Sequence, residues 1–124
     1  MKRTAALVGA TGGAGTTRLC VEVGALLAHA GRSVAVLDAA VATQGLARHA
    51  PGRIETDLTA LLTDAGDDAP LADALVDHPA DLAGRLALCP AYAPFERLAR
   101  AKTPTAAERF ADLVATAGRE FDHV

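Results

Sequence analysis

Glycines and hydroxyl side chains are concentrated near the start of the chain, in GATGGAGTT at residues 9–17. The backbone N–H groups of such a loop can approach phosphate oxygens closely, because glycine has no side chain in the way. A helix that begins directly after the loop adds a dipole that favours negative charge. Asp38 follows an apolar run further along and adds a carboxylate. The stretch therefore predicts a phosphate-binding site.

Two motifs fit the same glycines. Gly9-x-x-Gly12-x-x-Gly15 is the turn of a dinucleotide-binding fold, and residues 11–17 form a phosphate loop without its lysine. A dinucleotide-binding fold places its ribose-binding acid about 20 residues beyond the glycines. Asp38 lies further away, and the segment LALCPAYAP at 86–94, where a dehydrogenase of the short-chain type tends to carry an acid, contains no Asp. The spacing favours the phosphate loop, and an NAD(P)-binding oxidoreductase that uses Gly9, Gly12, Gly15 and Asp38 stays an alternative.

Buried strands and amphipathic helices are predicted around this loop. Short apolar runs predict parallel strands at 4–9, 33–38 and 85–91, and EFDHV at the end of the chain resembles the opening of another. The helix after the loop is expected to pack through one apolar stripe and to stop at Gly31. That stripe consists of Leu19, Val23, Leu26, Leu27 and Ala30.

The remaining chain predicts shorter elements. Residues 39–56 form a loop with a helical turn around Gly45–His49, and helices are expected at 57–65, capped by Asp57, and at 70–78. Residues 92–102 cross the end of the sheet. Thr103-Pro104 and the Thr105-x-x-Glu108 box start a last helix, which the stripe Phe110, Leu113, Val114 and Ala117 carries to Gly118. The fold class is α/β, a three-layer parallel sheet with helices on both faces, in one domain over residues 1–124.

Composition excludes several function classes. The 124 residues are 51% hydrophobic and carry a net charge of −3, without the basic cluster that nucleic acid or anionic lipid requires. No apolar run approaches the roughly 20 residues of a membrane helix. Cys20 and Cys89 are isolated, which is typical of buried thiols in a reducing cytoplasm. We expect a cytoplasmic protein.

Residues 4–124 resemble the amino-terminal half of the ParA/MinD family of deviant P-loop ATPases. The family pattern Lys-Gly-Gly-x-Gly-Lys-Thr corresponds to residues 11–17, its Asp-x-Asp to residues 38–40, and its FDxVxxD strand to the end of the chain. LCPAYAPFE is similar to a turn of the pilus-assembly branch, the CpaE or TadZ proteins. The resemblance implies a P-loop NTPase-like fold and an ATP or ADP site with magnesium. It assigns binding to Gly12, Gly13, Ala14, Gly15, Thr16, Thr17 and Asp38, with the Thr17 hydroxyl as metal ligand.

Three positions depart from the family pattern. Thr11 and Thr16 stand where the family has lysines, and Ala40 stands where it has the second acid, which positions the attacking water. Phosphoryl transfer depends on positive charge placed against developing negative charge. The departures predict a degenerate site without catalytic residues, in a partner-binding protein of cellular spatial organisation or partitioning. A slow ATPase rescued by Arg18 or by a partner's residue is the alternative, although Arg18 also has the spacing of a surface pair with Glu22.

The end of the chain is also informative under this resemblance. In the family the FDxVxxD strand lies between the first two strands and continues to an acid, whereas this sequence reaches only Val124. We expect a domain that is incomplete at its carboxyl end, with an exposed sheet edge. The resemblance also implies a homodimer or heterodimer through the face that carries the phosphate loop.

Overall fold

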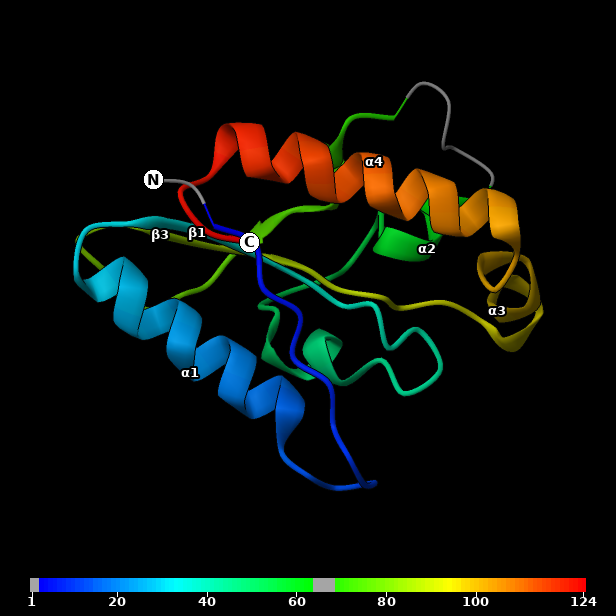
Figure 1. Cartoon of the computed structure of the whole chain (residues 1–124), viewed down its shortest axis with the longest axis horizontal. Coiled ribbons are helices and arrows are strands. Elements are labelled where there is room, and N and C mark those ends of the chain that lie inside the picture. Colours follow the sequence, from blue (N-terminus) through cyan, green and yellow to red (C-terminus); the bar gives the residue numbers. More distant parts are fainter. Residues whose placement is uncertain (1–2, 64–68) are drawn as a thin grey trace.

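The computed structural model describes residues 3–63 and 69–124. A central sheet has helices on both faces, so the predicted α/β class is confirmed (Figure 1). The helices are α1 (Thr16–His29), α2 (Leu58–Leu62), α3 (Phe95–Ala101) and α4 (Pro104–Glu120), with 3-10 turns η1 (Gly45–His49) and η2 (Leu71–Ala74). The strands are β1 (Ser33–Leu37), β2 (Val76–Asp77) and β3 (Arg85–Cys89).

The sheet is mixed rather than wholly parallel. Its strand order is β1-β3-β2, with β1 parallel to β3 and β2 antiparallel to it. The predicted helix over 70–78 is therefore wrong in its second half. Its first half forms η2, while Val76 and Asp77 pair with Leu88 and Ala87 of β3.

Successive residues of β1 face two different cores, because strand side chains alternate between the faces of a sheet. Val34 packs with the cluster beneath α1, which includes Val21, Leu86 and Leu88. Ala35 packs with the opposite cluster, beneath α2, η2 and α4. The predicted three layers are therefore present: α1, the sheet, and the α2–α4 layer (Figure 1).

Most of the apolar stripe predicted for α1 does not lie against the sheet, although Leu27 packs against the cluster beneath the helix. The buried residues are Val21, Gly24 and Ala28, and a Cβ added to Gly24 would lie 2.8 Å from Leu86 Cδ1. The missing side chain lets the helix axis approach the sheet closely, so the face containing the glycine is buried. Leu19, Val23 and Leu26 of the predicted stripe are exposed, at 53%, 41% and 70%.

The amino-terminal segment also differs from its prediction as a strand buried on both faces. Residues 3–10 are exposed, and strand pairing is limited to a bridge between Arg3 and His123. His123 also bridges Val34, so residues 122–124 lie between the amino-terminal segment and β1, as the resemblance implied. Asp122 fixes this arrangement, since its Oδ2 accepts hydrogen bonds from Ser33 N at 2.9 Å and Ser33 Oγ at 3.1 Å.

Several local predictions are confirmed. Asp57 caps α2 through Thr59 N and Ala60 N, and the helical turn at Gly45–His49 is η1. The α2 helix ends at Leu62, and part of its predicted extension to residue 65 lies outside the described residues. Thr103 caps α4, which continues two residues beyond Gly118. None of the described helices is long and apolar enough to cross a membrane.

Candidate functional site

The glycine loop leads directly into α1 and leaves the start of that helix open. Gly13 and Gly15 adopt the left-handed conformation, with φ of 74° and 78°, which side-chain-bearing residues rarely adopt. Gly15 is the N-cap and offers no side-chain acceptor, and the first backbone bond of the helix runs from Leu19 N to Gly15 O at 2.9 Å. The preceding N–H groups have no partner within the helix. These N–H groups can donate hydrogen bonds to an anion.

The predicted binding residues are divided between an exposed loop and a half-buried helix turn. Gly12, Gly13, Ala14 and Gly15 are exposed, whereas Thr16 and Thr17 are half-buried. A Cβ added to Gly9 would lie 2.8 Å from Thr16 Oγ1, so the hydroxyl at the family's lysine position faces back across the loop. The loop is therefore closed at its base, between Gly9 and Thr16, and open at its tip.

Thr17 and Asp38 meet at a segment that sequence reasoning did not assign to the site, Gly45–Leu46. A Cβ added to Gly45 would lie 2.7 Å from Thr17 Oγ1. The next residue, Leu46, donates its backbone N–H to Asp38 Oδ2 at 3.2 Å. The start of η1 thus lies against Thr17 and donates a hydrogen bond to Asp38. The sequence feature that could have indicated this segment is Gly45, the first residue of the predicted helical turn.

Asp38 is directed into the protein. Its side chain is 7% exposed, and its other oxygen, Oδ1, accepts the Ala40 backbone N–H at 3.0 Å. Burial raises the pKa of this carboxyl, and the hydrogen bonds from Leu46 and Ala40 partly oppose that rise. The pKa of the nearby Cys20 thiol is raised by burial and then by the charge of Asp38. A carboxylate in this position organises the 38–46 loop, and it is poorly placed to bind a ribose.

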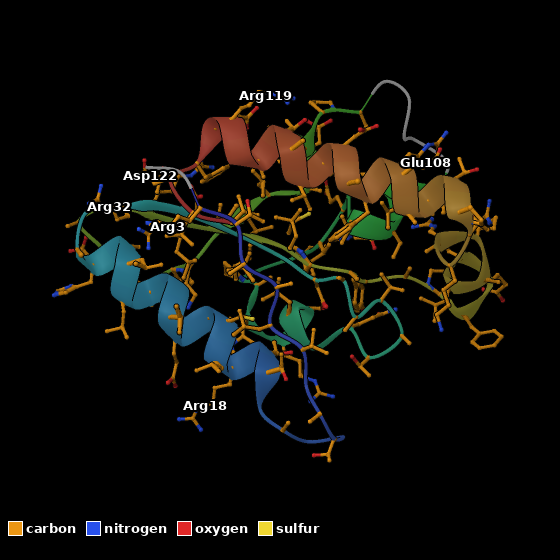
Figure 2. The ribbon with its side chains drawn as sticks, in the orientation of Figure 1. Arg3, Arg18, Arg32, Glu108, Arg119 and Asp122 are labelled. Atoms are coloured by element: carbon orange, nitrogen blue, oxygen red, sulfur yellow. The ribbon has the colours of Figure 1, made fainter. Side chains whose placement is uncertain are left out.

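The charged groups that could replace the missing lysines do not converge on the loop. Arg18 Nε donates to Glu22 Oε1 at 2.9 Å in an exposed pair, and the side chain projects outward from α1 (Figure 2). The predicted surface pair is thus present. Ala40 is exposed and contributes only its backbone N–H to Asp38. Among the described residues, no group of three or more His, Cys, Asp or Glu side chains could hold a metal ion.

A second carboxylate at the same end of the sheet was predicted only as a helix cap. Asp57 is 3% exposed, and besides Thr59 N and Ala60 N it accepts Thr59 Oγ1 at 2.6 Å and Tyr92 N at 2.8 Å. Arg97 Nη1 lies 3.3 Å from its Oδ1. Asp57 therefore connects α2, the segment after β3, and α3. Its hydrogen-bonding capacity is taken up within the protein, so its role is structural.

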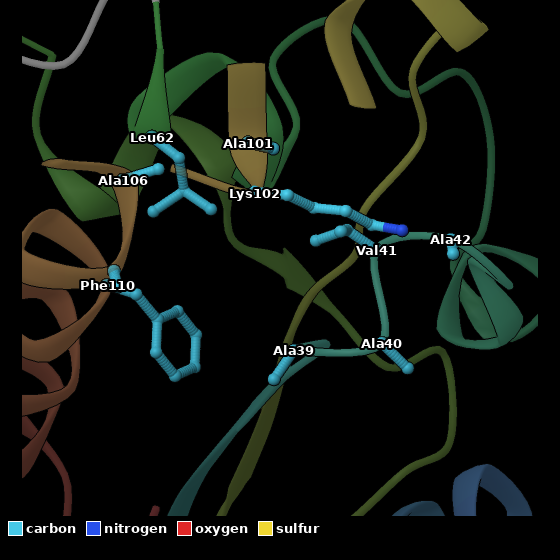
Figure 3. Close-up of a pocket in the computed structure, with 10 residues that line it drawn as sticks. Ala39, Ala40, Val41, Ala42, Leu62, Ala101, Lys102, Ala106 and Phe110 are labelled. Atoms are coloured by element: carbon cyan, nitrogen blue, oxygen red, sulfur yellow. The ribbon is translucent and has the colours of Figure 1, made fainter. Parts of the chain in front are cut away.

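An apolar pocket of about 310 Å³ opens beside the loop that follows Asp38. The 39–42 segment forms one wall, and residues of α2, α3 and α4 form the other (Figure 3). The side chain of Lys102 extends past Val41 and brings the one ammonium group among the lining residues (Figure 3). Burial raises the pKa of Cys89, in the neighbouring core, to about 12, so this thiol stays neutral and acts as packing.

The comparisons with known proteins identify the fold. No protein-family model and no curated protein matches this sequence. The structure is similar to the crystal structure of cobyrinic acid a,c-diamide synthase from Mycobacterium smegmatis with bound ATP analog and magnesium, with a TM-score of 0.69 and 22% identity. The alignment covers 100% of this chain and 50% of that chain, so this chain spans half the length of the synthase. The chain therefore shares the α/β, P-loop NTPase-like fold of that structure.

Proposed function

We propose that residues 1–124 form a nucleotide-binding domain of ParA/MinD type whose ATP site is degenerate. The observation that carries the proposal is the start of α1, where Gly13 and Gly15 are left-handed and no side chain caps the helix. Backbone N–H groups in that arrangement suit phosphate oxygens. The P-loop NTPase-like fold, shared with a synthase crystallised with an ATP analog and magnesium, supports the same assignment.

The residues present fit Mg·ATP or Mg·ADP in part. Residues 12–17 would hold the phosphates through backbone N–H groups, and the Thr17 hydroxyl would be the magnesium ligand. Bound magnesium would neutralise phosphate charge. Thr11 and Thr16 supply no positive charge, and Asp38 is engaged by Leu46 and Ala40. We therefore propose binding without hydrolysis by the family mechanism.

The biological role proposed with this site is partner binding rather than catalysis. Nucleotide binding without turnover would fix one conformation of the loop face, through which a second subunit, identical or different, would dock. The resemblance to the ParA/MinD family points to a cytoplasmic protein of cellular spatial organisation or partitioning. The resemblance to the pilus-assembly branch of that family, the CpaE or TadZ proteins, is part of this proposal.

The proposal is tested by thermal melting of the full chain with Mg·ATP, Mg·ADP and NADPH. A ligand that binds only the folded state raises the melting temperature. We expect a rise with Mg·ATP and Mg·ADP that Thr17→Ala reduces, and no rise with NADPH. A rise with NADPH alone would support the dinucleotide alternative. A cooperative melt that no nucleotide shifts at millimolar concentration would overturn the proposed site.

Restoring the missing charge gives a gain-of-function test. Thr16→Lys adds an ammonium at the family's lysine position, and a charge-assisted hydrogen bond contributes about 1.5–3 kcal/mol. We expect nucleotide affinity to rise about 10- to 150-fold, measured by calorimetry. Thr105→Lys, on the exposed surface of α4, adds the same net charge elsewhere and should leave affinity unchanged. Equal gains in both variants would indicate nonspecific electrostatics.

Hydrolysis is tested separately with the unmodified chain and Arg18→Ala. We expect no turnover of Mg·ATP above buffer in either protein. Steady turnover that Thr17→Ala abolishes would contradict the proposed loss of hydrolysis. Turnover that Arg18→Ala also abolishes would support the slow ATPase in which this arginine replaces the missing lysine.

A further inference from the structure

The apolar pocket beside residues 39–42 lies away from the glycine loop. Its wall of α2, α3 and α4 residues belongs to one face of the sheet, whereas the loop leads into α1 on the other face (Figure 1). Nine of its ten lining residues are Ala, Val, Leu or Phe, and the tenth is Lys102. Six of them are alanines, whose short side chains leave the space of about 310 Å³ open. We call this space the Lys102 pocket.

The wall formed by residues 39–42 is held in place by hydrogen bonds. Ala40 N donates to Asp38 Oδ1 at 3.0 Å, and Ala40 O accepts from Gln44 N at 3.1 Å. The Gln44 side chain bonds the Ala93 backbone twice, donating from Nε2 to Ala93 O at 3.1 Å and accepting at Oε1 from Ala93 N at 3.3 Å. This wall is therefore fixed both to the end of β1 and to the segment after β3.

The opposite wall is also fixed. Arg109 of α4 donates from Nη1 to Leu62 O at 3.3 Å and to Thr63 O at 2.6 Å, which ties α4 to the end of α2. Thr103 Oγ1 accepts from Ala106 N at 3.2 Å, and Ala106 is 1% exposed. Because both walls are held in this way, the pocket needs little reordering to receive a ligand, and reordering is one of the main costs of binding.

The charge of the pocket comes from Lys102. Its side chain extends past Val41 toward Ala42, with the aliphatic stem along the apolar wall and the ammonium at the far end (Figure 3). None of the ion pairs in the described part of the chain includes Lys102. An ammonium beside an apolar space attracts an anion whose remaining atoms are apolar.

We propose that the Lys102 pocket binds a small aliphatic monocarboxylate. The hydrocarbon chain lies against the alanines and Phe110, and the carboxylate accepts a hydrogen bond from the Lys102 ammonium. A single lysine acts as one point charge, which suits a monocarboxylate better than a doubly charged phosphate. The volume is near the lower end for ligand pockets, which span about 300–1,000 Å³, so a short chain fits. This binding is independent of nucleotide binding at the glycine loop.

Calorimetry on the full chain without nucleotide tests this site with hexanoate, butyrate and hexylamine. We expect hexanoate to bind about 10- to 15-fold more tightly than butyrate, because its two additional buried methylenes contribute about fourfold each. Hexylamine should bind at least about tenfold more weakly than hexanoate, because its ammonium would lie beside that of Lys102. Equal binding of hexanoate and hexylamine, or no binding of hexanoate at millimolar concentration, would overturn the proposal.

A reversal of charge tests the role assigned to Lys102. Lys102→Glu should invert the preference, so that hexylamine binds more tightly than hexanoate. Arg119→Glu makes the same change of net charge on the exposed surface near the far end of α4, and it should leave the preference for hexanoate intact (Figure 2). A preference for hexanoate that survives Lys102→Glu would contradict the proposal. So would a preference that both variants lose, since net charge alone would then determine binding.

Amide chemical shifts show where hexanoate binds. In the proposed site it should shift the amide signals of Val41 and Phe110 and leave that of Val23 unchanged. Val23 lies with Leu19 and Leu26 on the exposed apolar face of α1, another surface that an aliphatic chain can contact. Shifts confined to Val23 and its neighbours would place hexanoate on α1 and would rule out the Lys102 pocket as its site.

Discussion

Two helices start at the same end of the sheet, and their amino termini are built in opposite ways. The α2 helix begins at Asp57, a buried carboxylate that caps the first turn and also binds the Tyr92 backbone and Arg97. The α1 helix begins at Gly15, which offers no side chain at all. The first terminus is satisfied within the protein and the second is left for something outside it. This contrast supports the phosphate site proposed at the start of α1 and a structural role for the start of α2.

Among the tests of this difference between the two helix starts, we expect Asp57→Ala to have the largest effect. The substitution removes the acceptor of five donors, including the Thr59 hydroxyl at 2.6 Å and the Arg97 guanidinium at 3.3 Å. Breaking a buried ion pair by removing one partner costs about 3–5 kcal/mol. We expect the free energy of unfolding in urea to fall by about that amount.

Asp77→Ala is the matched control for this loss. Asp77 forms an ion pair with Arg85 at 2.8 Å, but both side chains are more than half exposed. Exposed pairs contribute about 0–1 kcal/mol. A similar loss of stability in the Asp57 and Asp77 variants would show that the buried carboxylate is not the structural junction inferred here.

A smaller effect is expected at the open terminus. Gly15→Ala places a side chain at φ of 78°, and the left-handed conformation costs a residue with a Cβ about 1–2 kcal/mol. Gly12→Ala has open space around the added Cβ and no positive φ, so its stability should change by less than about 0.5 kcal/mol. Equal stability of the two variants would indicate that the loop does not hold its left-handed turn in solution.

The two junctions also differ in how far the sequence predicts them. The Asp57 cap follows from local chemistry, because an acid directly before a helix can accept the N–H groups of the first turn. Its bonds to Tyr92 N and Arg97 depend on chain folding over more than 30 residues, and no local pattern encodes them. The glycine loop was likewise predicted, but the contact of Thr17 with Gly45 requires η1 to lie against α1.

The larger differences between the sequence prediction and the structure have a common cause, which is tertiary packing. Periodicity placed Leu19, Val23 and Leu26 on the buried face of α1, yet Gly24 lets the other face approach the sheet more closely. The spacing of apolar residues shows which of them share one face of a helix. It does not show how closely that face can approach the sheet. Residues 4–9 have the composition of a central strand, but a central strand requires partners on both edges. In the described residues their pairing partner is the short 122–124 segment.

The smallest expected effects are changes of stability with pH that depend on two aspartates. Asp38 lies beside the candidate site, and Asp122 lies at the edge of β1. The pKa of Asp38 is raised by burial, so its contribution to stability is present below its unfolded pKa and is lost as pH rises through the folded value. The pKa of Asp122 is lowered by the hydrogen bonds of Ser33. Its contribution is present above the unfolded pKa and is lost as pH falls through the folded value.

Urea unfolding between pH 3 and 7 tests these opposite signs against Asp38→Asn and Asp122→Asn. As pH rises, the stability of the unmodified chain should fall relative to Asp38→Asn, because the buried carboxyl must ionise. Relative to Asp122→Asn it should rise, because the ionised carboxylate is the form that accepts the Ser33 N–H at 2.9 Å. If the two stability differences changed with pH in the same direction, one of the two carboxylates would not have the surroundings seen in the structure. A flat Asp38 difference would place that side chain in water, where a nucleotide could reach it.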